Sequence, residues 1–128
     1  MVISSELGSA QQAEGQLLDE IARHGYSEAS TFAIKLAVEE ALNNAIKHGN
    51  KFDGSKKIDL SFDVGPDQAV VTITDQGEGF DPLGLADPTS DENLEKPTGR
   101  GVMLMRAYMD EVRFNDKGNQ VQLVKKNV

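Results

Sequence analysis

The sequence predicts an α+β domain in which a helical layer covers one face of a mixed, mainly antiparallel β-sheet. Two helix-like segments with apolar residues at three- and four-residue spacing come first, and pairs of alternating apolar segments joined by short turns follow. Packing the helices on one face of the sheet would bury both apolar surfaces. With 128 residues, the chain has the length of one domain, and we expect residues 1–128 to form one.

The two expected helices lie in the first third of the chain. Residues 9–24 have helical apolar spacing and are followed by Gly25. Ser27 can cap a second helix that includes residues 30–47, and Gly49 would end it. One face of this second helix should be buried, and its predicted members are Ala29, Phe32, Ala33, Leu36 and Ala37.

Two pairs of strands are expected after the helices. Residues 57–64 alternate apolar with polar side chains, and residues 69–74 follow a turn at 65–67, which predicts a hairpin. Residues 111–115 and 120–125 form a second pair around Asp116-Lys117-Gly118.

Three further segments complete the predicted order of elements. Residues 81–98 contain prolines, glycines and acids with few large apolar groups, which predicts a mobile loop. Residues 101–110 read as a short helix, and residues 1–6 as a possible additional strand.

Composition and charge exclude several classes of function. The 21 acidic and 13 basic residues give a net charge of -8, which works against contacts with nucleic acid or an anionic membrane but tolerates a basic protein partner. The absence of cysteine excludes disulfides and thiol chemistry. Apolar runs are too short to span a membrane, and residues 1–6 lack the features of a secretory signal. We therefore expect a cytoplasmic protein.

The first stretch whose side chains could bind a ligand or take part in a reaction is residues 40–49. Glu40 and Asn44 lie one helical turn apart and so share a face. An Asn oxygen together with nucleotide phosphates suits Mg²⁺, and a carboxylate one turn earlier can orient or deprotonate an attacking hydroxyl or water. Lys47 can reach a phosphate as a point charge. The alternative is that Glu40 and Asn44 are semi-buried polar side chains that only form hydrogen bonds within the fold.

Neighbouring polar residues receive no catalytic role. Glu39 and Asn43 are rotated by about 100° from their neighbours on the helix and should face solvent or the edge of the site. His24 and His48 have no metal-ligand spacing, and His24 should interact with the carbonyl groups at the end of the first helix.

The second stretch, residues 75–79, follows directly on a predicted strand. Gly77 and Gly79 permit close approach of the backbone to a ligand, and the Asp75 carboxylate can accept a hydrogen bond from an exocyclic amine such as that of adenine. A plain turn that ends the strand is the alternative.

The third stretch, Gly99-Arg100-Gly101, precedes a predicted helix. Free N–H groups and the positive end of the helix dipole attract phosphate there, and Thr98 and Arg100 add further donors. The alternative is a glycine hinge before a packed helix. The preceding loop at 81–98 is either a functional lid or a solvated linker.

In this order the three stretches resemble the N box, G1 box and G2 box of the histidine-kinase-type ATPase (GHKL) superfamily. Residues 37–45 and 109–112 resemble, more narrowly, the bacterial anti-sigma factors that double as serine/threonine protein kinases. The resemblance covers nearly the whole chain. It implies the Bergerat fold, a two-layer α/β sandwich in which ATP lies between the helical layer and the lid at 81–98.

The resemblance also implies ATP and Mg²⁺ as cofactors and assigns roles to residues. Glu40 would be the catalytic carboxylate and Asn44 the Mg²⁺ ligand. Asp75 would read adenine in a pocket that Gly77 and Gly79 shape. The full set expected to hold the nucleotide is Asn44, Lys47, Asp75, Gly77, Gly79, Thr98, Gly99, Arg100, Gly101 and Val102.

Partners follow from the same resemblance. It implies phosphorylation of a serine or threonine on a small anti-anti-sigma (STAS-domain) protein, sequestration of a sigma factor, and a homodimer, with no direct contact to nucleic acid or membrane. The alternative is a catalytically weak ATP-binding switch that binds a regulator in a non-sigma pathway. One departure concerns the last strand, where relatives often carry a threonine near adenine and this chain has Gln120-Val121-Gln122. A glutamine would bond the base directly or through water.

Overall fold

The computed structural model describes residues 1–51, 53–77 and 99–127. Among these residues, five strands form one sheet in the order β1-β2-β3-β5-β4, and every neighbouring pair is antiparallel. The bounds are Val2–Ser4 (β1), Lys57–Val64 (β2), Gln68–Thr74 (β3), Glu111–Phe114 (β4) and Gln120–Lys126 (β5). The expected hairpins β2–β3 and β4–β5 are confirmed, and the possible N-terminal strand is β1. The loop expected at 81–98 lies outside the described residues.

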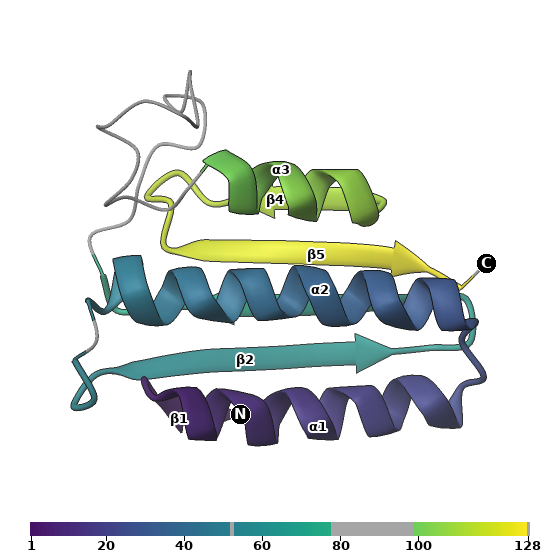
Figure 1. The fold of residues 1–128 in the computed structure, drawn as a ribbon, viewed down its shortest axis with the longest axis horizontal. Coiled ribbons are helices and arrows are strands. Elements are labelled where there is room, and N and C mark those ends of the chain that lie inside the picture. Colours follow the sequence, from purple (N-terminus) through teal and green to yellow (C-terminus); the bar gives the residue numbers. More distant parts are fainter. Residues whose placement is uncertain (52, 78–98, 128) are drawn as a thin grey trace.

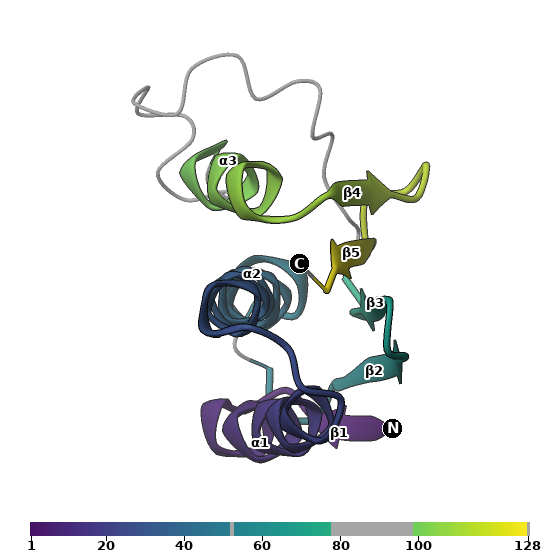
Figure 2. The same cartoon turned by 90° about the vertical axis from the view of Figure 1, so that its right-hand side faces the viewer.

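The helices α1 (Leu7–Arg23), α2 (Glu28–Asn44) and α3 (Gly99–Tyr108) lie together on one face of the sheet (Figures 1 and 2). In the end-on view of Figure 2 the helices form one layer and the strands the other. This arrangement is the predicted sandwich. None of the described helices has the length and apolar character needed to cross a membrane.

The first helix begins earlier than predicted. Leu7 starts it, and Glu6 is an extended N-cap residue with φ of -134°. At the other end, the His24 ring nitrogen Nδ1 lies 3.0 Å from the Glu20 carbonyl oxygen, which confirms the expected contact with the helix end.

The buried face of α2 differs from the predicted one. Ala29 is exposed, Leu36 is only half-buried and Phe32 is 56% exposed, its ring packing edge-on against Tyr108 of α3 with 6.0 Å between ring centroids. The cause is tertiary packing, because α2 lies between α1 and α3 and also covers the sheet, so its buried face is broad and rotated away from Phe32. The buried residues are Ser30, Ala33, Ile34, Ala37, Val38, Ala41 and Leu42.

The end of α2 is also not a simple helix terminus. The α-helix stops at Asn44, before the predicted end at Lys47, and Ala45–Gly49 continue as a π-helical turn, η1. The N–H of Asn50 closes this turn by donating to the Ala45 carbonyl at 2.8 Å. π-Helical turns widen the helix and shift the direction of the side chains that follow, and they are frequent at functional sites.

The core lies between the helices and the inner face of the sheet. Strand β2 shows the predicted alternation, with Ile58 and Leu60 fully buried and Asp59 and Ser61 exposed. Burial of one large aliphatic side chain contributes about 1.5–3 kcal/mol. The largest fully buried apolar side chains are Leu17, Ile21, Ile34, Val38, Ile46, Ile58, Leu60, Val71, Ile73, Met105 and Leu123.

Candidate functional site

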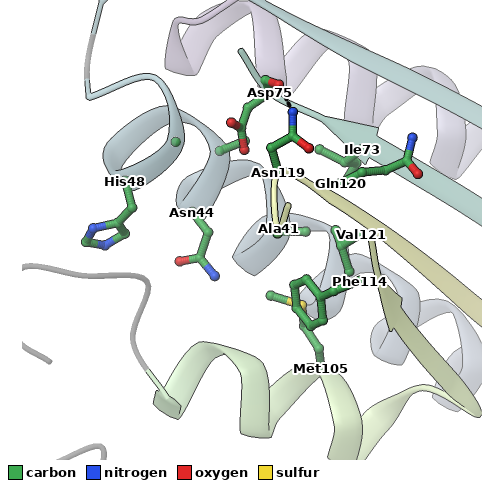
Figure 3. Close-up of a pocket in the computed structure, with 13 residues that line it drawn as sticks. Ala41, Asn44, His48, Ile73, Asp75, Met105, Phe114, Asn119, Gln120 and Val121 are labelled. Atoms are coloured by element: carbon green, nitrogen blue, oxygen red, sulfur yellow. Dashed lines mark hydrogen bonds between the residues drawn. The ribbon is translucent and has the colours of Figure 1, made fainter. Parts of the chain in front are cut away.

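A pocket opens where the end of α2 meets the ends of β3 and β5 (Figure 3). Its apolar wall consists of Ala41, Ala45, Ile73, Met105, Phe114 and Val121. Its polar side chains are Asn44, His48, Asp75, Asn119 and Gln120. An apolar wall with a few convergent polar groups is typical of a small-molecule site. The pocket therefore brings together parts of the first and second chemical stretches.

Two glycines allow the chain segments beside this pocket to touch. A Cβ atom on Gly77 would lie 2.0 Å from the carbonyl oxygen of Gly49, and one on Gly49 would lie 2.3 Å from Cγ of Asp75. Real Cβ atoms do not approach other atoms so closely. Position 77 requires glycine because it faces the backbone at the end of η1, whereas a Cβ at position 49 would displace the Asp75 side chain.

Hydrogen bonds hold Asp75 at the pocket. Its Oδ1 accepts the N–H of Gly77 at 2.7 Å, and its backbone N–H donates to the Asn119 carbonyl at 2.9 Å. The side-chain Nδ2 of Asn119 donates a hydrogen bond to the Asp75 carbonyl oxygen at 3.0 Å. Burial raises the pKa of Asp75, while the bond from Gly77 and the positive charges of Lys117 and Lys56 oppose the rise. The result is a fixed carboxylate that has lost much of its hydration.

The start of β5 contributes Gln120 to the pocket, whereas Gln122 does not line it. The Gln120 Nε2 donates to the Thr74 hydroxyl at 3.0 Å. Thr74 is the last residue of β3 and lies opposite Gln120 in the antiparallel pair of β3 and β5. This bond positions the Gln120 amide at the pocket, which Thr74 itself does not line.

Asn44 lines the pocket from the last turn of α2, and its buried Nδ2 has no hydrogen-bond partner. Rotation of the amide by half a turn exchanges nitrogen and oxygen, so this side chain can present Oδ1 to a cation instead. Among the described residues, no group of three or more His, Cys, Asp and Glu side chains is placed to hold a metal. The unpartnered Asn44 amide, turned in this way, fits Mg²⁺ as a single protein ligand, since this ion keeps several waters and takes phosphate oxygens beside one or two protein ligands.

Glu40 and Lys47 stand apart from this wall. Glu40 is half-buried one turn before Asn44 but is not among the residues that line the pocket. Lys47 is exposed on η1. His48 also lines the pocket, although no defined role was predicted for it.

The third stretch is described in part. Gly99 and Arg100 begin α3, and Gly101 and Val102 are buried in its first turn. Figure 1 shows that α3 begins at the end of the molecule where α2 ends, so its first N–H groups lie on the pocket's side. Gly79 and Thr98 lie outside the described residues.

Sequence reasoning missed four residues that build the site. Gly49 was predicted only to end the helix, and no role was predicted for Asn119. Asn50 is fully buried, donates from Nδ2 to the Lys57 carbonyl at 3.0 Å and accepts the N–H of Gln76 at 2.9 Å. Phe114 closes the apolar wall. The local signal that was available is Gly49-Asn50 itself, a glycine and an amide directly after the helix.

Comparisons with known proteins agree with this geometry. Residues 3–125 match the family described as histidine kinase-like ATPase domain. The chain is 33% identical over 101 residues to serine-protein kinase RsbW of Oceanobacillus iheyensis, a match that covers 74% of this chain and 64% of that protein. It is 34% identical over 110 residues to serine-protein kinase RsbW of Bacillus subtilis, with coverage of 80% and 69%.

A third relative is the anti-sigma F factor of Clostridium perfringens, 36% identical over 99 residues with coverage of 73% and 70%. The matches thus span about two-thirds of the length of these relatives. A solved structure of RsbU and RsbW domains from Mycobacterium tuberculosis covers 99% of this chain and 31% of that one, with a TM-score of 0.60 and 18% identity, and shows a shared fold. The predicted fold and the resemblance are confirmed, and the chain belongs to the histidine kinase-like ATPase domain family.

Proposed function

We propose that this protein is an ATP-dependent serine/threonine protein kinase that acts as an anti-sigma factor. The observation that carries the proposal is the pocket in which Asn44, at the end of α2, and Asp75, held against Gly49 and Gly77, lie on one apolar wall. Relatives named serine-protein kinase and anti-sigma F factor support the reaction type.

The base of the nucleotide would occupy the apolar part of the pocket. Asp75 is fixed by Gly77 and Asn119, and a fixed acceptor is suited to an exocyclic amine such as that of adenine. Gln120 would bond the base on the side of β5. Because these groups are already positioned, little ordering free energy is needed on binding.

The phosphates would lie toward the start of α3. The residues proposed to hold them are Lys47, Thr98, Gly99, Arg100, Gly101 and the N–H of Val102, with Gly79 shaping the base pocket beside Gly77. Asn44 Oδ1 would be the protein ligand of Mg²⁺. When bound, Mg²⁺ supplies charge neutralisation on the phosphates.

Glu40 would act on the acceptor. As a half-buried carboxylate one helical turn before Asn44, outside the pocket lining, it would accept the proton of an incoming serine or threonine hydroxyl. The protein group that accepts this proton also orients the hydroxyl for attack.

The partners in this proposal are proteins. An anti-anti-sigma protein with a STAS domain would donate the acceptor serine or threonine, and a sigma factor would be the sequestered ligand. The net charge of -8 favours a basic partner surface over nucleic acid or an anionic membrane. We place the chain in the cytoplasm, as one domain, acting as a homodimer.

The test is transfer of label from γ-labelled ATP, with Mg²⁺, to recombinant STAS-domain proteins of the same organism. We expect label on a serine or threonine of one of them. Glu40→Ala should keep nucleotide binding but lose transfer by about a hundredfold or more. Glu28→Gln, on the exposed first turn of the same helix, is the matched control and should transfer at the wild-type rate.

One result contradicts the kinase, and another contradicts the role of Glu40. Nucleotide-dependent binding of a regulator without label would identify the alternative, a switch module. Wild-type transfer by the Glu40→Ala variant would remove Glu40 from the mechanism.

A further inference from the structure

A groove separate from the nucleotide pocket lies between α1 and α2. Its polar side chains are Gln11 and Glu14 from α1 and Glu39 and Asn43 from α2. Figure 2 shows the two helices side by side. None of the residues that line this groove lines the nucleotide pocket.

Glu14 is the unusual residue in this groove. It is 8% exposed, and its buried Oε1 has no hydrogen-bond partner. Its side chain hydrogen-bonds to Glu39, a contact that two carboxyl groups can make only when they share a proton. Burial, and then Glu39, raise the pKa of Glu14 to about 7, while Lys35 opposes the rise.

Without a ligand, such a buried acid lowers the stability of the fold. A buried polar oxygen without a partner costs about 1–3 kcal/mol, and two carboxylates in contact repel each other. Within the described part of the chain, no lysine or arginine forms an ion pair with Glu14 or Glu39. Lys35 acts on Glu14 without forming an ion pair, so no direct contact in this part of the chain neutralises the two carboxyl groups.

The spacing of the four polar residues favours one small ligand. Gln11 and Glu14 are three residues apart on α1, and Glu39 and Asn43 are four apart on α2, so each pair lies on one helical face. All four side chains carry oxygen atoms. Carboxylate and amide oxygens are the ligands that hard divalent cations prefer.

We propose that the groove between α1 and α2 binds one hard divalent cation between Glu14 and Glu39, with the side-chain oxygens of Gln11 and Asn43 able to complete its coordination. The cation replaces the shared proton, which leaves to solvent, and its two positive charges balance the two carboxylates. The site needs no nucleotide and is distinct from the Mg²⁺ ligand proposed at Asn44.

The test is binding of Mn²⁺ alone to the nucleotide-free chain at pH 8, measured by loss of the free-ion electron paramagnetic resonance signal. We expect one Mn²⁺ per chain at this site. Glu14→Gln and Glu39→Gln should each weaken binding about tenfold or more. Glutamine matches the shape of a protonated carboxyl group, so both variants should fold, and thermal melting verifies this.

Two controls separate this site from the others. Asp19→Asn removes an exposed carboxylate from α1 and should change the affinity less than about twofold. Asn44→Ala should leave this binding intact, so the inference survives even if the kinase proposal fails. No bound Mn²⁺ at millimolar concentration overturns the inference. So does unchanged binding in both glutamine variants, or loss of binding in Asn44→Ala.

Discussion

The backbone of Gly77 lies so close to Gly49 that a Cβ atom at position 77 would sit 2.0 Å from the Gly49 carbonyl oxygen. This contact joins the end of η1 to the turn after β3. It fixes Asp75 beside Asn44, although the two residues are far apart in the sequence. The nucleotide pocket therefore depends on an approach of two backbone segments that only glycine permits.

Gly77→Ala should damage both stability and binding. The atom that the new methyl group meets is backbone, so it cannot rotate away, and we expect a loss of about 2–4 kcal/mol in the free energy of unfolding. Urea denaturation checks the stability, and calorimetry with ATP and Mg²⁺ checks the binding.

The control for this substitution is Gly15→Ala on α1. A Cβ there would meet nothing within 4 Å, and alanine is favoured over glycine in a helix by about 0.5–1 kcal/mol. We expect Gly15→Ala to be neutral or stabilising. Equal behaviour of the two variants would show that the contact between Gly77 and Gly49 is dispensable.

Asp75→Asn should lower the affinity for ATP while the chain stays folded. The amide can still accept the Gly77 N–H, but it presents one donor where the carboxylate presents only acceptors. We expect a loss of about 1–3 kcal/mol in the free energy of ATP binding. Titration of ATP against GTP checks it, because the variant should also discriminate less between the two bases. Undiminished ATP affinity and preference would remove Asp75 from base recognition.

Stability should depend on pH through Glu14. The pKa of Glu14 is about 7 in the folded state against an ordinary 4.5, so the folded state holds a proton that the unfolded state releases between these values. The stabilising effect of that proton is complete below about pH 4.5 and is lost as the pH rises through 7.

Glu14→Gln keeps a neutral side chain at every pH. In metal-free buffer at pH 8 the variant should therefore be more stable than the wild type by about 3 kcal/mol, with little difference near pH 4.5. Denaturant titrations between these pH values measure the difference. A constant difference across the range would exclude proton binding at Glu14 as its cause.

Local patterns in the sequence were sufficient to predict the helices and strands and their order along the chain. The strands were predictable because Ile58 and Leu60 alternate with polar residues, and the second helix because Ser27 accepts the N–H of Ser30 at 3.1 Å, as an N-cap does. The exposure of Phe32 was not predictable, because it depends on where α1 and α3 pack around α2. The π-helical turn of η1 also has no periodic signature.

The candidate site was predictable in its motifs but not in its construction. Asn44 and Asp75 were identified from short stretches, and the structure places both in one pocket. Asn119 reaches Asp75 only because β5 pairs with β3, a relationship that no local spacing reveals. The Glu14 contact with Glu39 was missed for the same reason, since Glu39 was expected to face solvent or the edge of the site.

Isothermal calorimetry with ATP, in the presence and absence of Mg²⁺, on the wild type and Asn44→Ala shows whether Asn44 helps to hold Mg²⁺ and ATP in the pocket. We predict one ATP per wild-type chain, with an affinity that Mg²⁺ strengthens and that Asn44→Ala makes insensitive to Mg²⁺. Absence of measurable heat at millimolar nucleotide, or an unchanged Mg²⁺ dependence in Asn44→Ala, would contradict the account.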